Sequence, residues 1–207
     1  MASDAFSYLA LGDSYTIGES VDSALRWPVL LAEALRLKGL AVQEPVIVAR
    51  TGWTTDELTA GIQAAGLAGS YDFVSLLIGV NNQYRGRELE EYRDQFIDLL
   101  SQAEAFAGGD PKKVLVLSIP DWGVTPFAEG RDRDQIAREI NAFNQVNRME
   151  SDAAGVRYLD ITGISREAVE IPELVASDGL HPSGVMYARW AEAGLPIALE
   201  ILGFGPG

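Results

Sequence analysis

The chain has 207 residues, and its 16 basic and 30 acidic side chains give a formal net charge of −14 at pH 7. Hydrophobic residues make up 47% of the chain and charged residues 22%, which is an ordinary balance for one globular domain, here expected to span residues 1–207. Nucleic acids and anionic membrane surfaces are bound through basic patches, so this composition disfavours both as partners. The acidic residues instead predict a soluble, self-repelling surface.

The chain contains no cysteine, which excludes disulfides, thiol catalysis and thiolate metal sites. Its first ten residues, Met1 to Ala10, lack both a basic segment and a long apolar segment, so we expect no secretory signal. No apolar run approaches the roughly 18 residues of a membrane span. The sequence therefore predicts a cytoplasmic protein, while a trimmed mature form and the oligomeric state stay open.

Five short apolar runs, flanked by Gly, Pro or Asp, predict strands that are buried on both faces: 6–11, 46–49, 73–78, 114–118 and 156–161. Helical patterns lie between and after them, at 27–38, 54–65, 89–106, 136–149 and from 183 onward. We expect Gly194 and Pro196 to interrupt the last helix. This alternation predicts an α/β fold, with a parallel sheet, right-handed crossovers and helices on both faces.

Residues capable of acyl-transfer chemistry follow the predicted strands. Ser14 follows the first strand, and Gly52 and Asn81 follow the second and third. The only histidine, His181, comes after the fifth strand, with Asp178 three residues before it. Because the carboxyl ends of parallel strands meet at one edge of a sheet, we expect these residues to lie together.

Each of these residues supplies a different part of acyl-transfer chemistry. A serine hydroxyl needs a base to take its proton, and His181 is the available imidazole. The backbone N–H of Gly52 is open to close approach, and the Asn81 amide is a suitable oxyanion donor. Taken singly, residues of these types are more often turn, helix-cap or loop residues than catalytic ones. Their joint occurrence in this order predicts nucleophilic catalysis.

Four blocks of the sequence resemble those of the SGNH (GDSL-type) hydrolases: Gly12-Asp13-Ser14-Tyr15, Gly52, Gly79-Val80-Asn81 and Asp178-Gly179-Leu180-His181-Pro182. The resemblance runs from about residue 6 to residue 190. It implies a flavodoxin-like, three-layer α/β/α sandwich around a five-stranded parallel sheet. It also implies that Ser14 is the nucleophile, His181 the general base and Asp178 the acid that orients the histidine. The implied oxyanion hole consists of the backbone N–H groups of Ser14 and Gly52 and the side-chain amide of Asn81.

Three positions test how far this resemblance extends. Asn82 stands where the family often has Asp, and we expect a changed loop hydrogen bond with activity retained. Asp160, at the end of the fifth strand, is a rival to Asp178, which we favour because it lies in the matching block. Thr16 occupies the place of the second glycine of a Gly-x-Ser-x-Gly elbow, so the α/β-hydrolase elbow does not fit.

The sequence thus predicts a serine esterase that works through an acyl-enzyme and acts on small acyl or aryl esters. No cofactor is expected, and a single histidine without cysteine disfavours a zinc site, so no metal is expected either. Acetylated sugars, lysophospholipids and acyl thioesters stay open as substrates. A non-catalytic ligand-binding module on the same fold is the alternative from another class. A nucleotide binder is disfavoured because no glycine-rich phosphate motif is present.

Aromatic side chains near the predicted site are candidates for an acyl or aryl pocket, with core packing as the alternative: Trp53, Tyr84, Trp122 and Phe127. The longest irregular stretch, 120–132, is expected to be either a pocket wall or lid, or a surface crossover. Arg85 and Arg87 follow Asn81 closely and either meet an acidic group on the substrate or are solvated.

Overall fold

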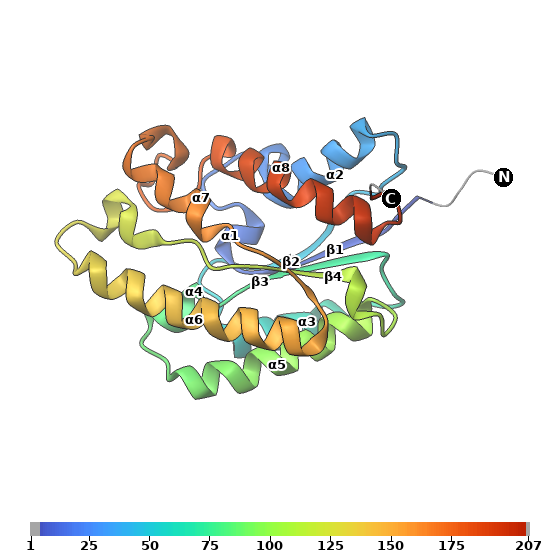
Figure 1. Ribbon diagram of the computed structural model, residues 1–207, viewed down its shortest axis with the longest axis horizontal. Helices are drawn as coiled ribbons and strands as arrows, with labels where there is room; N and C mark the ends of the chain where they lie inside the picture. The colour runs from blue at the N-terminus through green and yellow to red at the C-terminus, as the bar shows by residue number, and fades with distance from the viewer. Residues whose placement is uncertain (1–4, 206–207) are drawn as a thin grey trace.

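The computed structural model describes residues 5–205, in which five parallel strands form a sheet between two layers of helices (Figure 1). The strand order is β2-β1-β3-β4-β5, which confirms the predicted flavodoxin-like sandwich. The three central strands, β1, β3 and β4, are buried at every residue, which explains their continuous apolar sequences. The strand bounds are β1 Tyr8–Gly12, β2 Val46–Ala49, β3 Phe73–Leu77, β4 Val114–Leu117 and β5 Arg157–Leu159.

Long helices cover both faces of the sheet. One face carries α2 (Trp27–Leu37) and α8 (Gly184–Ile201), with the short α7 (Thr162–Arg166) beside them (Figure 1). The other face carries α3 (Thr55–Ala65), α5 (Leu89–Phe106) and α6 (Arg133–Ala154). Two further short helices, α1 (Ser14–Ile17) and α4 (Val80–Tyr84), start directly after β1 and β3.

The start of α3 shows how the sequence sets a helix boundary. The backbone N–H of Thr54 donates to Glu57 Oε2 at 2.9 Å, as the predicted capping box requires. The helix ends at Gly66, which adopts the left-handed conformation that suits glycine. Because this boundary is fixed locally, the preceding loop that carries Gly52 leaves β2 along a defined path.

The last helix differs from the prediction, because α8 continues without a break through Gly194 and Pro196. Proline removes one intrahelical hydrogen bond, so burial along the helix has to compensate. Gly194 is buried in the middle of the helix, where a Cβ would be in ordinary contact, 3.5 Å from Leu159 Cδ2 of β5. Trp190 and Ala198, on the same side of the helix, are fully buried. Close packing against the sheet therefore outweighs the local tendency of the helix to break.

Strand ends also differ from the predicted ranges by one or two residues. The first strand begins at Tyr8, and Phe6 forms only an isolated bridge with Val42. The fifth strand ends at Leu159, because Asp160 Oδ1 accepts the backbone N–H of Thr162 at 2.9 Å and so starts a turn. Short polar side chains that bond to nearby backbone end a strand in this way.

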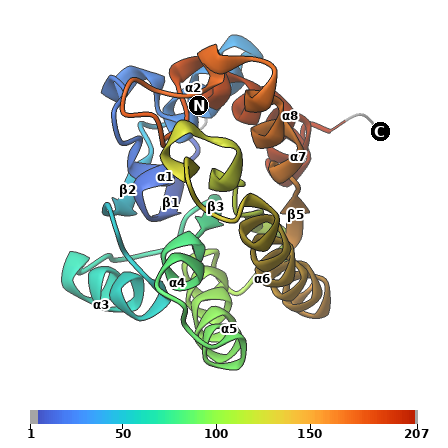
Figure 2. The ribbon, with the colours of Figure 1, turned by 90° about the vertical axis from the view of Figure 1, so that its left-hand side faces the viewer.

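The sheet order fixes where a ligand can bind. After β1 the chain moves to β2 at one edge and then returns past β1 to β3, so the direction of strand addition reverses between β1 and β3. Parallel sheets of this kind bind ligands at the carboxyl ends of the strands, beside this switch point. Figure 2 looks at this end of the molecule and shows α1 and α4 close to it, together with the 120–132 loop in yellow.

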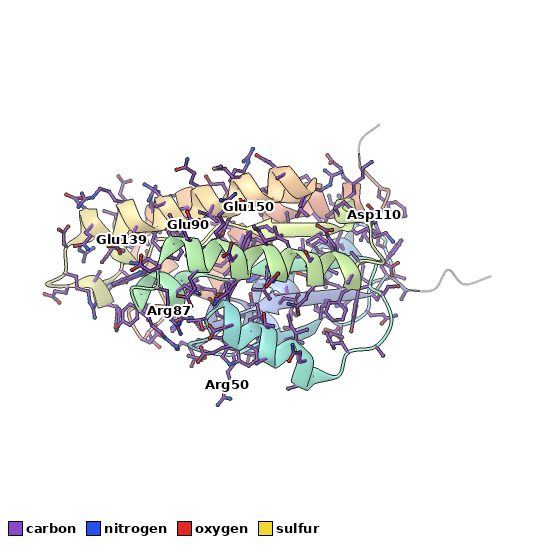
Figure 3. All side chains as sticks on the ribbon, turned by 90° about the horizontal axis from the view of Figure 1, so that it is seen from below. Arg50, Arg87, Glu90, Asp110, Glu139 and Glu150 are labelled. Atoms are coloured by element: carbon purple, nitrogen blue, oxygen red, sulfur yellow. The ribbon has the colours of Figure 1, made fainter. Side chains whose placement is uncertain are left out.

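Figure 3 shows charged side chains on the face opposite α2 and α8, among them Arg87 in the loop before α5, Glu90 of α5, and Glu139 and Glu150 of α6. One ion pair crosses between two helices, with Arg93 Nε of α5 2.6 Å from Glu150 Oε1 of α6. Exposed pairs of this kind are screened by solvent and contribute little to stability. The layer is therefore held mainly by its apolar underside, which includes the fully buried Phe96.

Within residues 5–205, no helix is long and apolar enough to cross a membrane. We expected one domain over residues 1–207 and no secretory signal in Met1 to Ala10. Both expectations include residues outside the described range. The single-domain organisation and the cytoplasmic location therefore stay predictions.

Candidate active site

The candidate nucleophile is held by a sharp turn at the end of β1. Asp13 caps α1, because its Oδ1 accepts the backbone N–H of Tyr15 at 3.0 Å, and the buried Ser14 is the first helical residue. Glycine is required just before the turn: a Cβ on Gly12 would lie 2.2 Å from Thr16 Oγ1. The helix can therefore fold back onto the strand only because residue 12 has no side chain.

The imidazole of His181 is fixed by a carboxylate from the same loop. His181 Nδ1 lies 2.6 Å from Asp178 Oδ2, while Asp178 Oδ1 accepts the backbone N–H groups of Leu180 and His181, each at 2.9 Å. Partial burial opposes ionisation of Asp178, but hydrogen bonds from Ser20, His181 and the backbone hold the pKa of its carboxyl well below the usual range. The group facing the imidazole is therefore an anion at neutral pH.

The rival acid Asp160 lies in a different network. Its Oδ1 accepts hydrogen bonds from the Ser118 hydroxyl at 3.1 Å and from the backbone N–H of Thr162. The same Ser118 hydroxyl accepts the backbone N–H of Ile161. These bonds tie the end of β5 to the end of β4, and it is Asp178, not Asp160, that lies against His181.

Gly52 adopts a backbone conformation that other residues resist, with φ of 86°. Its carbonyl oxygen accepts a hydrogen bond from Arg85 Nη2 at 2.6 Å, and Arg85 Nη1 lies 3.3 Å from Glu57 Oε2. Arg85 therefore holds the Gly52 peptide in place. The sequence offered one signal for this role, because Arg85 follows Asn81 by four residues, or one helical turn.

The Asn81 amide is oriented by a backbone carbonyl that the sequence did not reveal. Asn81 Nδ2 donates to the carbonyl oxygen of Trp53 at 2.9 Å, which uses one of its two N–H groups. The helix that carries Asn81 begins after Gly79, whose φ of 126° again requires glycine. The second amide N–H is left available for a ligand.

Asn82 points away from the site and caps a neighbouring helix. It is buried, and its Oδ1 accepts the backbone N–H of Thr55 at 3.1 Å, while its Nδ2 donates to Thr55 Oγ1 at 2.8 Å. The Thr55 hydroxyl in turn donates to Gln95. An amide fits this position because the network needs both an acceptor and a donor, which ionised Asp cannot supply.

A cavity of about 170 Å³ brings the candidate residues together. Ser14, Gly52, Asn81 and His181 line it, together with Tyr84, Trp122, Phe127 and other side chains. Trp53 is the exception, because its ring packs over Gly61 on α3, where a Cβ would lie 2.1 Å from the indole. The prediction that Trp53 lines the pocket is therefore wrong, and its contribution to the site is its backbone carbonyl.

Aromatic residues form one wall of this cavity, and the 120–132 loop supplies two of them. Trp122 is buried and donates through Nε1 to Gln83 Oε1 at 2.8 Å, and its ring meets that of Tyr84 edge-on with centroids 5.4 Å apart. Arg131 lies 5.3–5.4 Å from the ring centroids of Tyr84, Trp122 and Phe127. The loop is thus a pocket wall, stabilised from outside by a cation that sequence reasoning did not single out.

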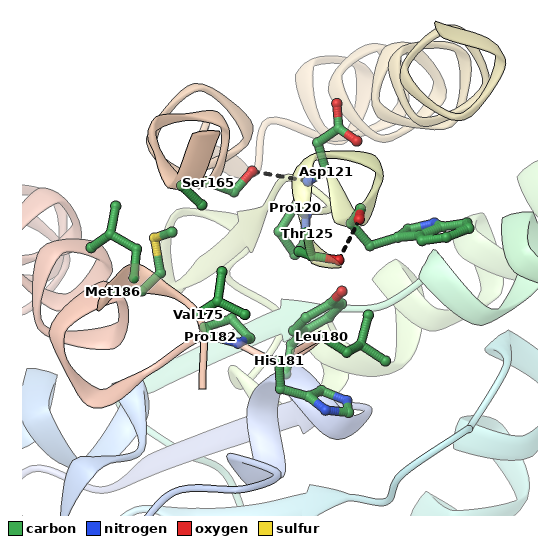
Figure 4. Close-up of a pocket in the computed structure, with 13 residues that line it drawn as sticks. Pro120, Asp121, Thr125, Ser165, Val175, Leu180, His181, Pro182 and Met186 are labelled. Carbon is green, nitrogen blue, oxygen red and sulfur yellow. Dashed lines mark hydrogen bonds between the residues drawn. The ribbon is translucent and has the colours of Figure 1, made fainter. Parts of the chain in front are cut away.

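A second cavity of about 20 Å³ lies on the other side of His181 (Figure 4). There the Ser165 hydroxyl accepts the backbone N–H of Asp121 at 2.9 Å, and the Thr125 hydroxyl donates to the carbonyl oxygen of Trp122 at 2.7 Å. The first bond holds the loop against α7, and the second closes a turn within the loop. The space is too small for a substrate group, so a ligand has to approach from the larger cavity.

Two features describe the state of the site in residues 5–205. No hydrogen bond joins the Ser14 hydroxyl to His181, although both line the same cavity; such bonds often form only once a substrate is bound. The backbone N–H groups of Ser14 and Gly52 have no acceptor in this part of the chain, so both are free to donate. The same residues contain no group of three or more acidic or histidine side chains that could hold a metal ion.

Known sequences and solved structures that resemble this chain identify its family. A sequence model of the GDSL-like lipase/acylhydrolase family matches residues 10–189. The fold is similar to the crystal structure of TesA, with 21% identity, a TM-score of 0.73 and coverage of 95% of this chain and 99% of that chain. A comparison with curated proteins gives no significant match.

Two further solved structures show the same fold. The psychrotrophic esterase EstA from Pseudoalteromonas sp., inhibited by monoethylphosphonate, has 14% identity and a TM-score of 0.72, with coverage of 95% of this chain and 98% of that chain. The acetylxylan esterase Axe2 from Geobacillus stearothermophilus has 20% identity and a TM-score of 0.72, with coverage of 96% and 94%. The chain belongs to the GDSL-like lipase/acylhydrolase family and is a hydrolase that acts on ester bonds.

Asp13 gives a pH-dependent prediction for stability. Burial raises the pKa of its carboxyl to about 7, and its Oδ2 has no hydrogen-bond partner. An unfolded Asp titrates near pH 3.9, so the stability contributed by the neutral form is complete below about pH 4 and is lost as the pH rises through 7. Asp13→Asn cannot ionise and should gain up to about 4 kcal/mol relative to the wild type between pH 4 and pH 8.

Urea unfolding at several pH values measures this difference. The matched control is Asp94→Asn at an exposed position of α5, which should give the pH profile of the wild type. Parallel stability profiles for Asp13→Asn and the wild type would show that Asp13 is already ionised in the folded protein.

Proposed function

We propose that this hydrolase is a serine esterase in which Ser14, His181 and Asp178 form the catalytic triad. The observation that carries the proposal is the shared cavity: Ser14 and His181 both line it, and His181 Nδ1 is bonded to Asp178 on the side away from it. A serine hydroxyl needs such an oriented base to become nucleophilic. A pure binding module would have no use for this arrangement.

The reaction then proceeds in two halves. Ser14 Oγ attacks the ester carbonyl carbon while His181 Nε2 takes the hydroxyl proton, and a C–O bond to serine forms. The imidazolium returns this proton to the departing alkoxide as the ester C–O bond breaks. Water attacks the acyl-enzyme with His181 again as base, which releases the acid and restores Ser14. Throughout, the Asp178 anion holds the ring and stabilises its protonated form.

Three donors are available for the oxyanion of each tetrahedral intermediate: the backbone N–H groups of Ser14 and Gly52 and the second amide N–H of Asn81. Arg85 anchors the Gly52 carbonyl, in the peptide group that follows the Gly52 N–H donor, and the Trp53 carbonyl holds the Asn81 amide. The donors are thus fixed before substrate arrives, which is the condition under which such groups lower a barrier most.

The cavity favours esters with a small acyl or aryl group. Its volume of about 170 Å³ is close to the roughly 150 Å³ of an apolar cavity that holds benzene. The walls away from the polar groups are apolar, formed by Val80, Tyr84, Trp122, Phe127 and Leu180. Long acyl chains would extend beyond this cavity, and the carbons outside it would add little binding energy. We therefore infer an optimum near four to six carbons.

Hydrolysis of p-nitrophenyl esters from acetate to decanoate tests both parts of the proposal. The wild type should turn over butyrate and hexanoate fastest, and Ser14→Ala should fall to background with every member. Equal hydrolysis by both proteins would show that Ser14 is not the nucleophile. An optimum at decanoate would contradict the inferred pocket size, and selective turnover of acetylated sugars, lysophospholipids or thioesters would point to those substrates instead.

Asn81 should stabilise the transition state and should contribute little to substrate binding. Asn81→Ala should lower kcat by about 10²–10³-fold with KM nearly unchanged. Asn81→Asp is the matched variant of equal size, and it should lose more, because a carboxylate repels the developing oxyanion. Full kcat in Asn81→Ala would remove this residue from the oxyanion hole.

Paired substitutions distinguish the two candidate acids. Asp178→Asn should lower kcat by up to about 10⁴-fold, because a neutral amide neither stabilises the imidazolium nor selects its tautomer. Asp160→Asn should stay within about tenfold of the wild type, since an amide oxygen can still accept the Thr162 N–H. The opposite ranking of the two variants in steady-state kinetics would assign the role to Asp160.

A further inference from the structure

The segment that follows α1 contains an unusual backbone position. Ser20 has φ of 63°, and it is the only non-glycine residue with positive φ among residues 5–205. Residues with a Cβ avoid this left-handed region unless the surrounding structure holds them there. The helix before it already ends at Gly18, which takes the usual left-handed position and donates its N–H to the Ser14 carbonyl. Ending the helix therefore does not explain the conformation of Ser20.

The side chain of Ser20 reaches the proposed triad. Its hydroxyl donates to Asp178 Oδ2 at 2.7 Å, across 158 residues of sequence. The adjacent Glu19 accepts a hydrogen bond from the Thr51 hydroxyl, next to Gly52. This short segment, Gly18–Ser20, thus contacts both the loop that carries the acid and the loop that carries an oxyanion donor.

The bond from Ser20 completes the set of donors around the carboxylate. The backbone N–H groups of Leu180 and His181 fix Oδ1, and Ser20 and His181 Nδ1 share Oδ2. The Asp178 side chain is 30% exposed, so water could replace the Ser20 hydroxyl but would not hold a fixed direction. Two fixed donors on Oδ2 limit rotation of the carboxylate and therefore of the imidazole bonded to it.

We propose that Ser20 is a positioning residue, which acts through Asp178 to hold His181 in the orientation that the reaction needs. This inference rests on the proposed function of Asp178. The alternative is that Ser20 only shapes its own loop, and the two roles predict different effects of glycine at position 20. Glycine suits a φ of 63° better than serine, so it preserves the loop, but it removes the hydroxyl.

Steady-state kinetics of Ser20→Gly and Ser20→Ala on p-nitrophenyl butyrate separate the two roles. If Ser20 positions Asp178, both variants should lose about tenfold in kcat, the cost of one hydrogen bond to a charged group, with KM within twofold of the wild type. Ser20→Asn, which tolerates positive φ and keeps a hydrogen-bond donor in its amide, should recover part of the loss. The matched control is Ser23→Ala at an exposed position three residues beyond Ser20, which should match the wild type. Wild-type kcat in Ser20→Gly would overturn the proposal.

The pH profile and a double mutant test whether Ser20 acts through Asp178. Without the Ser20 donor, more negative charge remains on Asp178, which favours the protonated imidazole, so the acid limb of kcat/KM should move to higher pH. Other ionisable groups near the triad are the same in all variants: Asp13, Tyr15, Glu19, Asp121 and Tyr187. In the Asp178→Asn background, Ser20→Gly should cost less than twofold. The proposal would be contradicted if the acid limb of kcat/KM stayed at the wild-type pH. It would also be contradicted if Ser20→Gly lowered kcat by the full tenfold in the Asp178→Asn variant.

Failure of this inference is distinguishable from failure of the proposed function. If Ser14→Ala abolishes turnover and Asp178→Asn lowers it strongly while Ser20→Gly does not lower it, the triad stands and only the role of Ser20 is wrong. If Asp178→Asn keeps full activity, the triad assignment fails, and the inference fails with it.

Discussion

A parallel sheet places the carboxyl ends of all its strands at one edge, and the candidate site depends on this constraint. Ser14, Gly52 and Asn81 follow β1, β2 and β3, three adjacent strands around the switch point of the sheet. His181 arrives from a loop beyond β5, at the far end of the chain. The buried central strands hold these loops in fixed relative positions, because shifting one strand would require repacking the core on both faces.

Three polar groups that line the cavity are each held in place by a residue outside the cavity lining. Arg85 holds the Gly52 peptide, the Trp53 carbonyl orients the Asn81 amide, and Asp178 fixes the imidazole. This arrangement leaves the N–H groups and the second imidazole nitrogen directed to one space. A site built in this way needs little reorganisation when charge develops on a substrate, which is the main source of electrostatic catalysis.

The sequence predicted the fold class, the sheet and the long helices because buried strands and amphipathic helices have distinct periodicities. It predicted Ser14, Gly52, Asn81, Asp178 and His181 as candidates because their motifs follow strand ends. It failed at α8, where burial of side chains such as Trp190 and Ala198 overrides the effect of Pro196, and at Trp53, whose ring packs on Gly61. The sequence did not predict the roles of Arg131 and Ser20, because these arise from contacts between loops that no local pattern encodes. For Arg85 its spacing from Asn81 was the one local signal, and its bond to the Gly52 carbonyl was not predicted.

The central claim is that this geometry makes Ser14 a nucleophile. Labelling the protein with a fluorophosphonate, which reacts with activated serines and not with ordinary ones, tests it directly. Intact mass and peptide mapping should show one adduct per chain, located on Ser14, and His181→Ala should slow its formation by several orders of magnitude. An adduct on another residue, or esterase activity that persists after complete labelling elsewhere, would contradict the account.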